Sequence, residues 1–440
     1  MQLETLKEPP KTEVGSYFVA NYPPFSVWSK QHVPAALKAL ATPPKDDRPL
    51  GLYMHIPFCR KRCKFCYFRV YTDKNASDVD VYMDALAREV ALYAREPGIG
   101  GREFEFVYFG GGTPSFLSNQ QLERLIGRIQ EHWTWEAARE VTFECEPGTL
   151  KGSKLQTIKK IGVTRLSLGV EHFDDEVLEI NGRAHKSPEI FRAYQWARDV
   201  GFPQINIDLI AGMLGETEDK WKVTVDKALA MQPDSLTIYQ MEVPFNTKIA
   251  KESKSHGETS TPIASWAQKR AWVDYAFGVF EKAGYVVSSA YTLVKPERHA
   301  GFVYRDSLWH GADLVGTGVA SFSHFGDVHY QNVDSWEEYT AKLDNNELPI
   351  NRALPVPPHQ RLIREMILQL KMGKIDAGYF RNKFGVEITH EFADAYKSLV
   401  DEGFVQISGD EVRVTRQGLL RVDSLLSRFF EPEFRNIRYT

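Results

Sequence analysis

The chain has 440 residues and a formal net charge of −4, with 43% hydrophobic and 25% charged residues. The hydrophobic share is typical of a folded globular protein and excludes a disordered chain. The weakly acidic balance argues against attraction of the whole chain to nucleic acid, so we expect no nucleic-acid partner. Four cysteines are too few for a small disulfide-stabilised secreted scaffold.

The sequence carries no recognisable targeting signal. Its first residues, MQLETLKEPPKTEV, are polar and charged and lack the apolar core of a secretory signal. The apolar stretch at 207–214 contains Asp208 and is much shorter than the ~20 residues of a membrane span. We therefore expect a cytoplasmic protein, monomeric and not bound to a membrane, whose thiols are free to bind metal.

An N-terminal extension, residues 1–48, is followed by β-rich runs that alternate with segments of helical periodicity. The six expected strands are Leu52–Ile56, Phe104–Phe109, Val141–Cys145, Arg165–Val170, Gln204–Ile210 and Ser235–Met241. The expected helices are Val79–Arg95, Ser118–His132, Leu155–Ile161, Ser187–Val200 and Glu218–Met231. This alternation predicts an α/β fold with a parallel sheet, and the length favours a partial (β/α)6 barrel of the TIM type over residues 49–350.

The last part of the chain, residues 351–440, has a different pattern. Helical periodicity at His359–Leu370, Ala377–Phe384 and Ile388–Asp401 is followed by two short strands, FVQIS and EVRVT. A final helix is expected at Gln417–Phe429. Helices followed by a small hairpin predict a winged-helix-like accessory domain. We interpret it as a lid or docking module, because no helix concentrates the Arg or Asn residues that read DNA bases.

Residues suited to chemistry follow each of the six expected strands. In a parallel barrel, the carboxyl ends of the strands and the loops after them form one functional rim. The first two strands lead into His55 to Cys66 and Gly110 to Pro114; Glu144 ends the third strand, Glu171 ends the fourth, Asp208 lies in the fifth, and Glu242 follows the sixth. Their agreement in position indicates a single site.

Three of the four cysteines, Cys59, Cys63 and Cys66, lie within eight residues. At this spacing their sulfurs can point to a common centre, and three thiolates leave one iron of a [4Fe-4S] cluster open to another ligand. The alternative is a zinc ion with a fourth ligand elsewhere, such as His55. Zinc sites usually pair two separated C-x2-C motifs, which the sequence lacks, so the pattern favours the cluster.

Other residues at the rim have two interpretations each. The glycines of GGGTP allow close approach of backbone N–H groups to a ligand, or they form a tight turn before a helix. Glu144 is either solvated or an acceptor for a ribose or ammonium group, and Arg183 is either a surface residue or the partner of a carboxylate. Asp208 interrupts the apolar strand INIDLIAG, where an unpartnered carboxylate is costly, so a role in the site is favoured.

Basic residues alternate with the cysteines at Arg60, Lys61, Arg62 and Lys64. They form either a solvated loop or a surface that docks an acidic electron donor, such as flavodoxin or ferredoxin. We favour the second interpretation.

The cysteine loop, with an aromatic residue (Phe65) before its last cysteine, resembles the signature of the radical S-adenosylmethionine (SAM) superfamily. The motifs YMHIPFC, YFGGGTP, ECEP, TRLSLGVE, INIDLIAG and LVGTGVAS are similar to those of the oxygen-independent coproporphyrinogen III oxidase-like subgroup. The resemblance runs from about residue 15 to residue 430 and includes the C-terminal domain.

The resemblance implies a [4Fe-4S] cluster held by Cys59, Cys63 and Cys66, and one or two SAM molecules. The cluster-bound SAM would contact Tyr53, Gly111 and Glu144. The positions that match a second SAM site are Phe65, Gly112, Thr113, Glu171, Arg183 and Asp208.

Four departures from the subgroup's pattern point away from its best-known reaction. Phe68 replaces a cysteine, Glu171 replaces a glutamine, Glu242 replaces a small residue, and RDSLWHGAD is a shortened substrate-side segment. We therefore expect radical methyl or methylene transfer to an aromatic or heteroaromatic small molecule, with Glu242 and Tyr53 as catalytic candidates. The alternatives are oxidative decarboxylation of coproporphyrinogen III to protoporphyrinogen IX, and a heme-binding or heme-trafficking role.

Overall fold

The computed structural model describes residues 18–244, 247–250, 263–298 and 301–435; the polar N-terminal stretch lies outside them. The described chain divides into two compact units. One runs from Val27 to Pro357, and the other joins the described residues before Val27 to the segment from Pro358 onward. The expected extension, residues 1–48, is therefore divided between the units, and residues 351–357 group with the barrel. No described helix is both long and apolar enough to cross a bilayer.

The larger unit contains a twelve-stranded sheet whose central strands are the six that the sequence predicts. These strands are β1 (Leu50–Ile56), β2 (Phe104–Gly111), β3 (Glu140–Cys145), β4 (Arg165–Glu171), β5 (Gln204–Ala211) and β6 (Ser235–Gln240). They lie side by side in chain order, and every neighbouring pair is parallel. In the described residues, the two edge strands of the sheet, β12 and β7, do not pair with each other. The barrel is therefore not closed, which confirms the predicted partial barrel.

Six further strands extend the sheet at both ends, and the sequence analysis missed them. They are β7 (Val286–Val287), β8 (Thr292–Val294), β9 (Asp313–Thr317), β10 (Phe322–Phe325), β11 (Val328–Asn332) and β12 (Ile350–Pro355). β9 pairs in parallel with β1 and carries part of the LVGTGVAS motif. These strands are short and mix polar with apolar residues, so they show neither a long apolar run nor a clear alternation.

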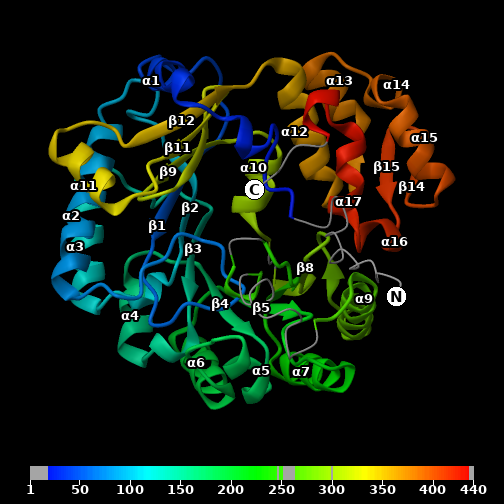
Figure 1. Ribbon diagram of the computed structural model, residues 1–440, viewed down its shortest axis with the longest axis horizontal. Helices are drawn as coiled ribbons and strands as arrows, with labels where there is room; N and C mark the ends of the chain where they lie inside the picture. Colours follow the sequence, from blue (N-terminus) through cyan, green and yellow to red (C-terminus); the bar gives the residue numbers. More distant parts are fainter. Residues whose placement is uncertain (1–17, 245–246, 251–262, 299–300, 436–440) are drawn as a thin grey trace, which may run out of the picture. The chain divides into compact units, whose positions relative to one another are not determined.

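The helices predicted between the strands cover the outer side of the barrel (Figure 1). They are α2 (Ala76–Tyr93), α3 (Asn119–Gln130), α4 (Gly152–Lys160), α6 (Ser187–Val200) and α7 (Glu218–Met231). Capping boxes begin α2 at Asn75 and α3 at Ser118, where each side chain accepts a hydrogen bond from the backbone of the first turn. Each helix buries an apolar face, such as Leu122, Leu125 and Ile129 of α3.

Two of the remaining helices of this unit, α9 and α10, bear on the site. The full set is α1 (Val33–Leu40), α5 (Asp175–Ile180), α9 (Trp266–Lys282), α10 (Val303–Trp309) and α11 (Trp336–Asp344). In α10, the ring of Tyr304 lies 4.4 Å from that of Tyr108 on β2, measured between centroids. Beside it, the ring of Phe302 lies 4.1 Å from the guanidinium carbon of Arg165, at the start of β4. Aromatic side chains therefore fill the space beneath the rim.

The C-terminal unit has the helix-and-hairpin order of a winged helix, as predicted. Its elements are α12 (Pro358–Leu370), β13 (Lys374–Asp376), α13 (Ala377–Phe384), α14 (Ile388–Glu391), α15 (Ala393–Asp401), β14 (Val405–Ser408), β15 (Glu411–Val414), α16 (Arg416–Leu419) and α17 (Val422–Leu426). The strands form an antiparallel sheet in the order β13-β15-β14. Two predicted helices are each broken in two, because Phe392 and Arg421 have non-helical backbone angles.

Candidate functional site

The cysteine loop follows β1 and is tied to the rest of the barrel through its backbone. The N–H of Cys59 donates to the carbonyl of Tyr71 (3.0 Å), and the N–H of Tyr71 donates back to Pro57 (2.7 Å). Near the middle of the loop, the N–H of Lys64 donates to the carbonyl of Asn181 (2.9 Å). These bonds fix the loop at its start, middle and end, so the three thiols have a defined orientation.

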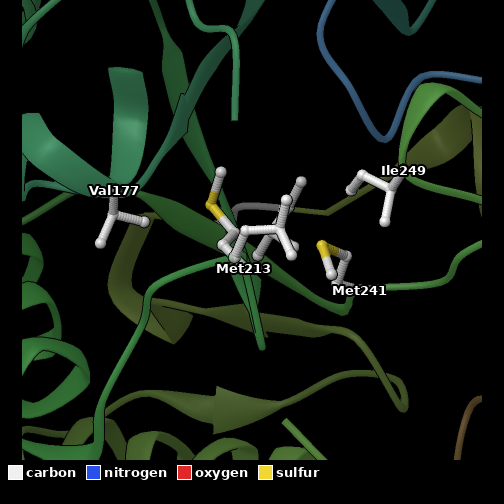
Figure 2. Close-up of a cluster of buried hydrophobic side chains, with 6 residues drawn as sticks. Val177, Met213, Met241 and Ile249 are labelled. Atoms are coloured by element: carbon white, nitrogen blue, oxygen red, sulfur yellow. The ribbon is translucent and has the colours of Figure 1, made fainter. Parts of the chain in front are cut away.

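The aromatic residue of the motif, Phe65, anchors the loop by packing against an apolar cluster. The cluster comprises Val177, Ile210, Met213, Leu214, Met241 and Ile249. Figure 2 shows Met213 and Met241 between Val177 on one side and Ile249 on the other. Phe65 thus has a clear packing role in this structure, and its expected contact with SAM stays a prediction.

The three thiols of the loop lie close enough to influence one another. Desolvation raises the pKa of Cys59 to about 12 and that of Cys66 to about 11. The charges of the neighbouring cysteines contribute to both shifts in the same direction. Two side chains donate hydrogen bonds to the sulfurs: Thr113 to Cys59 (3.4 Å) and Arg183 to Cys63 (3.2 Å).

These thiols form no disulfide. Within the described residues, no group of three or more His, Cys, Asp or Glu side chains is arranged to hold a single metal ion. Three neighbouring thiols, two of which accept a hydrogen bond at sulfur, fit ligation of a positively charged iron–sulfur core, which removes the thiol protons.

At the end of β3, Glu144 is bound by its neighbours rather than solvated. Its carboxylate accepts hydrogen bonds from the hydroxyl of Tyr108 (2.7 Å) and the N–H of Gly111 (3.2 Å). Desolvation, together with the charge of Asp208, raises the pKa of Glu144 to about 7. The ring of Tyr53 lies 5.9 Å from that of Tyr108, so the predicted residues Tyr53, Gly111 and Glu144 do come together.

At the end of β4, Glu171 and Arg183 form a partly desolvated pair. Arg183 Nη2 lies 3.6 Å from Glu171 Oε1 and also donates to the carbonyl of Gly169 (2.6 Å). Both side chains are only 10–12% exposed, which rules out the surface role considered for Arg183. Because Arg183 also donates to Cys63, it connects the cysteine loop to the fourth strand.

Asp208, in β5, is hydrogen-bonded by neighbouring side chains, which offsets the cost of burying a carboxylate in an apolar strand. Its carboxylate accepts hydrogen bonds from the hydroxyl of Ser167 (2.9 Å) and the side-chain amide of Asn206 (2.9 Å). Burial still raises its pKa, and its charge raises those of Glu144 and Glu171. Three carboxyl groups therefore share the interior of the barrel, an environment that favours a cationic ligand.

The triple glycine packs directly on the cysteine loop. A Cβ atom on Gly112 would lie 2.8–2.9 Å from backbone atoms of Pro57, Ile56 and Phe58. Gly112 also donates its N–H to the carbonyl of Ile56 (2.9 Å), and Gly111 has a φ of 111°. Close approach of the two loops therefore explains these glycines, and the expected contacts of Gly111 and Gly112 with SAM stay predictions.

Glu242 follows β6 and lies near residues that the sequence analysis missed. Burial and, to a lesser extent, the charge of Glu242 raise the pKa of Tyr67, and the same charge partly opposes the lowering of the pKa of Lys269 by burial. Lys269 is buried on α9 and donates to the carbonyl of Met241 (2.8 Å), and desolvation lowers its pKa to about 8. A lysine within a helix gave no signal in the sequence, because only the tertiary fold brings it to the end of β6.

A second missed group holds the cysteine loop to the segment after β3. Glu146 accepts hydrogen bonds from Arg60 (2.9 Å) and from His185 Nδ1 (2.8 Å). Desolvation acts to raise the pKa of Glu146, but the hydrogen bond from His185 and the charges of His185 and Arg60 lower it to about 2. Arg60 is therefore part of a structural ion pair.

Comparison with known proteins identifies the class of this fold and site. Residues 53–228 match the radical SAM superfamily model, and residues 356–421 match the HemN C-terminal domain model. The chain belongs to the radical SAM superfamily. Within it, the chain falls in the oxygen-independent coproporphyrinogen III oxidase-like subgroup, as the relatives below show.

The similarity to individual relatives covers most of each chain. The oxygen-independent coproporphyrinogen III oxidase of Escherichia coli (strain K12) is 27% identical, over 90% of this chain and 88% of the relative. The heme chaperone HemW of Bacillus subtilis (strain 168) is 27% identical, over 86% of this chain and 98% of the relative. The structure of the coproporphyrinogen III oxidase HemN from Escherichia coli superposes with a TM-score of 0.82 at 26% identity, covering 94% of this chain and 96% of HemN.

Membership has two consequences for the expectations from the sequence. A radical SAM enzyme uses a [4Fe-4S] cluster and SAM, and the three thiols of the loop suit such a cluster. None of the relatives above is named a methyltransferase, so the expectation of methyl transfer gains no support from them. The contacts assigned to individual site residues stay predictions.

Proposed function

We propose that this radical SAM enzyme acts on a tetrapyrrole, and that oxidative decarboxylation of coproporphyrinogen III to protoporphyrinogen IX is its best-supported reaction. The observation that carries the proposal is the similarity to a coproporphyrinogen III oxidase over 94% of the chain, which includes both the barrel and the C-terminal domain. Further support comes from the cysteine loop, which follows β1, and from the three carboxyl groups, which lie on the adjacent strands β3, β4 and β5.

Individual residues of the site would have separate roles in this reaction. Cys59, Cys63 and Cys66 would hold the cluster. A reduced cluster held by these thiols would supply the electron for reductive cleavage of SAM. Glu144 and Asp208 would accept hydrogen bonds from the hydroxyl and ammonium groups of SAM, because both are acceptors at the rim.

Two side chains at the end of β1, Tyr53 and His55, form a neutral hydrogen-bonded pair next to the cysteine loop. The hydroxyl of Tyr53 lies 3.3 Å from His55 Nδ1, and His55 Nε2 lies 3.2 Å from the carbonyl of Arg69. Desolvation lowers the pKa of His55 to about 4, so its ring is neutral near pH 7. Because the carbonyl of Arg69 can only accept, His55 Nε2 carries the ring proton and Nδ1 accepts a hydrogen bond from the hydroxyl of Tyr53, so the pair adds no charge at the site.

Radical methyl or methylene transfer to a ring substrate is the second candidate. The observation that favours it is Phe68, which stands where the decarboxylating subgroup has a further cysteine. Glu242 adds a carboxylate that a proton-transfer step can use. A heme-binding role is the third candidate, and it is favoured by the similarity to a protein named a heme chaperone.

Turnover under strict anaerobiosis tests these candidates. The reconstituted protein is incubated with coproporphyrinogen III, SAM and a reductant, and products are separated after oxidation to porphyrins. We expect protoporphyrin IX together with 5′-deoxyadenosine. S-adenosylhomocysteine and a methylated ring, without loss of carboxyl groups, would favour the second candidate. Heme binding without SAM cleavage would favour the third.

Two cysteine variants provide a matched control for this assay. Cys66→Ala removes a proposed cluster ligand, so bound iron, sulfide, visible absorption and 5′-deoxyadenosine formation should all fall sharply. Cys145→Ala removes a buried thiol on β3 outside the loop and should retain the cluster. Full iron content in Cys66→Ala would contradict the cluster assignment.

We also propose that an acidic one-electron carrier of the flavodoxin or ferredoxin type docks beside the cysteine loop. A hollow of about 370 Å³ opens there. It is lined by Arg60, Lys61, Arg62, Lys64, Thr72, Glu179, Gly182 and Lys248. Five of these eight residues are basic, although the whole chain has a net charge of −4. Such local complementarity accelerates encounter with an acidic partner.

A further inference from the structure

An exposed aromatic pair follows the third cysteine of the loop. Tyr67 is 40% exposed and Phe68 is 49% exposed. Their ring centroids lie 4.7 Å apart, with 34° between the ring planes. Among the exposed large apolar side chains of the described residues, these are the two that adjoin in sequence. Single exposed apolar residues are common, whereas a contiguous apolar surface indicates a binding site.

The backbone that carries this pair is held in place from both sides. Arg62 Nη2 donates hydrogen bonds to the carbonyl of Cys66 (3.3 Å) and to that of Phe68 (3.5 Å). On the preceding side, Phe65 is packed into the apolar cluster. The chain therefore turns one aromatic ring inward and presents the next two to solvent. A surface held in this way loses little conformational entropy when a ligand binds.

The pair borders the site and does not lie on a remote face. Tyr67 and Phe68 directly follow Cys66, the third cysteine of the loop. On the other side of Cys66, Phe65 packs against the apolar cluster that contains Met241, the residue before Glu242. The pair therefore lies beside the cysteine loop, close to the end of β6.

We propose that Tyr67 and Phe68 form a stacking platform for an aromatic ring of the substrate, either a pyrrole ring or the face of a tetrapyrrole. The proposal deepens the function above and rests on it only in requiring that the substrate carries such a ring. Two adjoining rings offer the area and the quadrupole that stacking needs, at little entropic cost. Where related enzymes have a cysteine, the side chain of Phe68 thus contributes to binding of the substrate.

Binding of coproporphyrin III, followed by its absorption and fluorescence, tests the platform without any turnover. We expect Phe68→Ala to weaken binding about three- to tenfold, the range expected for loss of an aromatic stack. Phe68→Trp should bind as tightly as the unmodified protein. Butanetetracarboxylate, which carries carboxylates without a ring, should compete equally poorly against all three proteins.

Phe191→Ala is the matched control, because Phe191 is 41% exposed on α6 and its ring lies 5.4 Å from that of Phe173. It removes an exposed stacked ring away from the cysteine loop and should leave binding unchanged. Thermal unfolding of each variant checks that it folds. The proposal is overturned if coproporphyrin III does not bind, if Phe68→Ala binds it normally, or if Phe191→Ala weakens binding to the same extent.

The binding result and the turnover result are independent. Failure to cleave SAM would contradict the proposed enzyme function but would leave a Phe68-dependent affinity for the ring intact. Conversely, full turnover with unchanged porphyrin affinity and unchanged KM in Phe68→Ala would reject the platform and leave the enzyme function standing.

Discussion

At the scale of single residues, Glu171 combines several unusual features. Its backbone is in the left-handed region, with a φ of 64°, which residues other than glycine rarely adopt. Its carboxyl group is largely buried, and desolvation raises its pKa to about 7 even though Arg183 lies nearby. The related enzymes that we expect to decarboxylate their substrate have glutamine here. The side chain therefore carries a cost in the free protein that a bound cation would reduce.

Glu171→Gln tests this cost through the pH dependence of stability. The pKa of Glu171 is higher in the folded state (about 7) than its ordinary value of 4.5, so the folded protein binds more protons between these values. Stability should therefore fall as the pH rises from about 4.5 through 7. Glu171→Gln removes this loss. The gain in the free energy of unfolding of the variant over the unmodified protein should therefore be larger at pH 8 than at pH 5, by on the order of 2 kcal/mol.

Urea unfolding of the cluster-free protein across this pH range measures the effect. Glu136→Gln, at an exposed position, should leave the pH dependence unchanged. An identical pH profile for Glu171→Gln and the unmodified protein would show that the carboxyl group ionises without a penalty.

At the scale of elements, the site depends on how closely the loop after β2 approaches the loop after β1. Gly112 lies against backbone atoms of that neighbouring loop, and backbone cannot move aside as a flexible side chain can. Gly111 in turn positions Glu144 through its N–H. The spacing between two loops thus determines the positions of both the thiols and a carboxylate.

Gly112→Ala should therefore destabilise the protein by about 1–3 kcal/mol, the usual cost of overpacking, and should lower the iron content after reconstitution. Gly127→Ala is the matched control, because Gly127 lies on α3 and its added Cβ would meet nothing within 4 Å. That change should stabilise the protein by about 0.5–1 kcal/mol through helix propensity. Equal effects of the two changes on stability would refute the packing argument.

At the scale of the whole molecule, charge is distributed unevenly. The chain is slightly acidic overall, yet basic residues surround the hollow beside the cysteine loop. Arg60 forms a salt bridge with Glu146, whereas Lys61 and Lys248 are exposed. An acidic electron carrier would meet a local positive field at the point closest to the proposed cluster.

The double change Lys61→Glu and Lys248→Glu should slow 5′-deoxyadenosine formation driven by reduced flavodoxin by about tenfold at low salt. The difference should shrink as salt is added, because screening weakens exposed charge pairs. The rate with dithionite should stay unchanged, as should both rates in Lys38→Glu, which alters an exposed lysine on α1. An equal loss with dithionite would indicate damage to the site itself.

The sequence alone determined the six central strands, their order and the residues at their ends. It could do so because strand and helix periodicities are local and because parallel strands with helical connections place all carboxyl ends on one rim. Ser187–Val200 and Glu218–Met231 match the structure residue for residue for the same reason. The spacing of the cysteines likewise indicated a cluster without knowledge of the fold.

Only the tertiary structure decided which partners surround these residues. Arg183 donates to a thiol 120 positions earlier in the chain, and Lys269 reaches the end of β6 from a later helix. Likewise, Phe65 turns inward while Tyr67 and Phe68 remain exposed, although all three are aromatic residues of one loop. Such contacts depend on packing between segments far apart in the chain, which local periodicity does not record. The sequence therefore determined which residues form the rim, and the tertiary fold decided which of them are buried, paired or left open to a ligand.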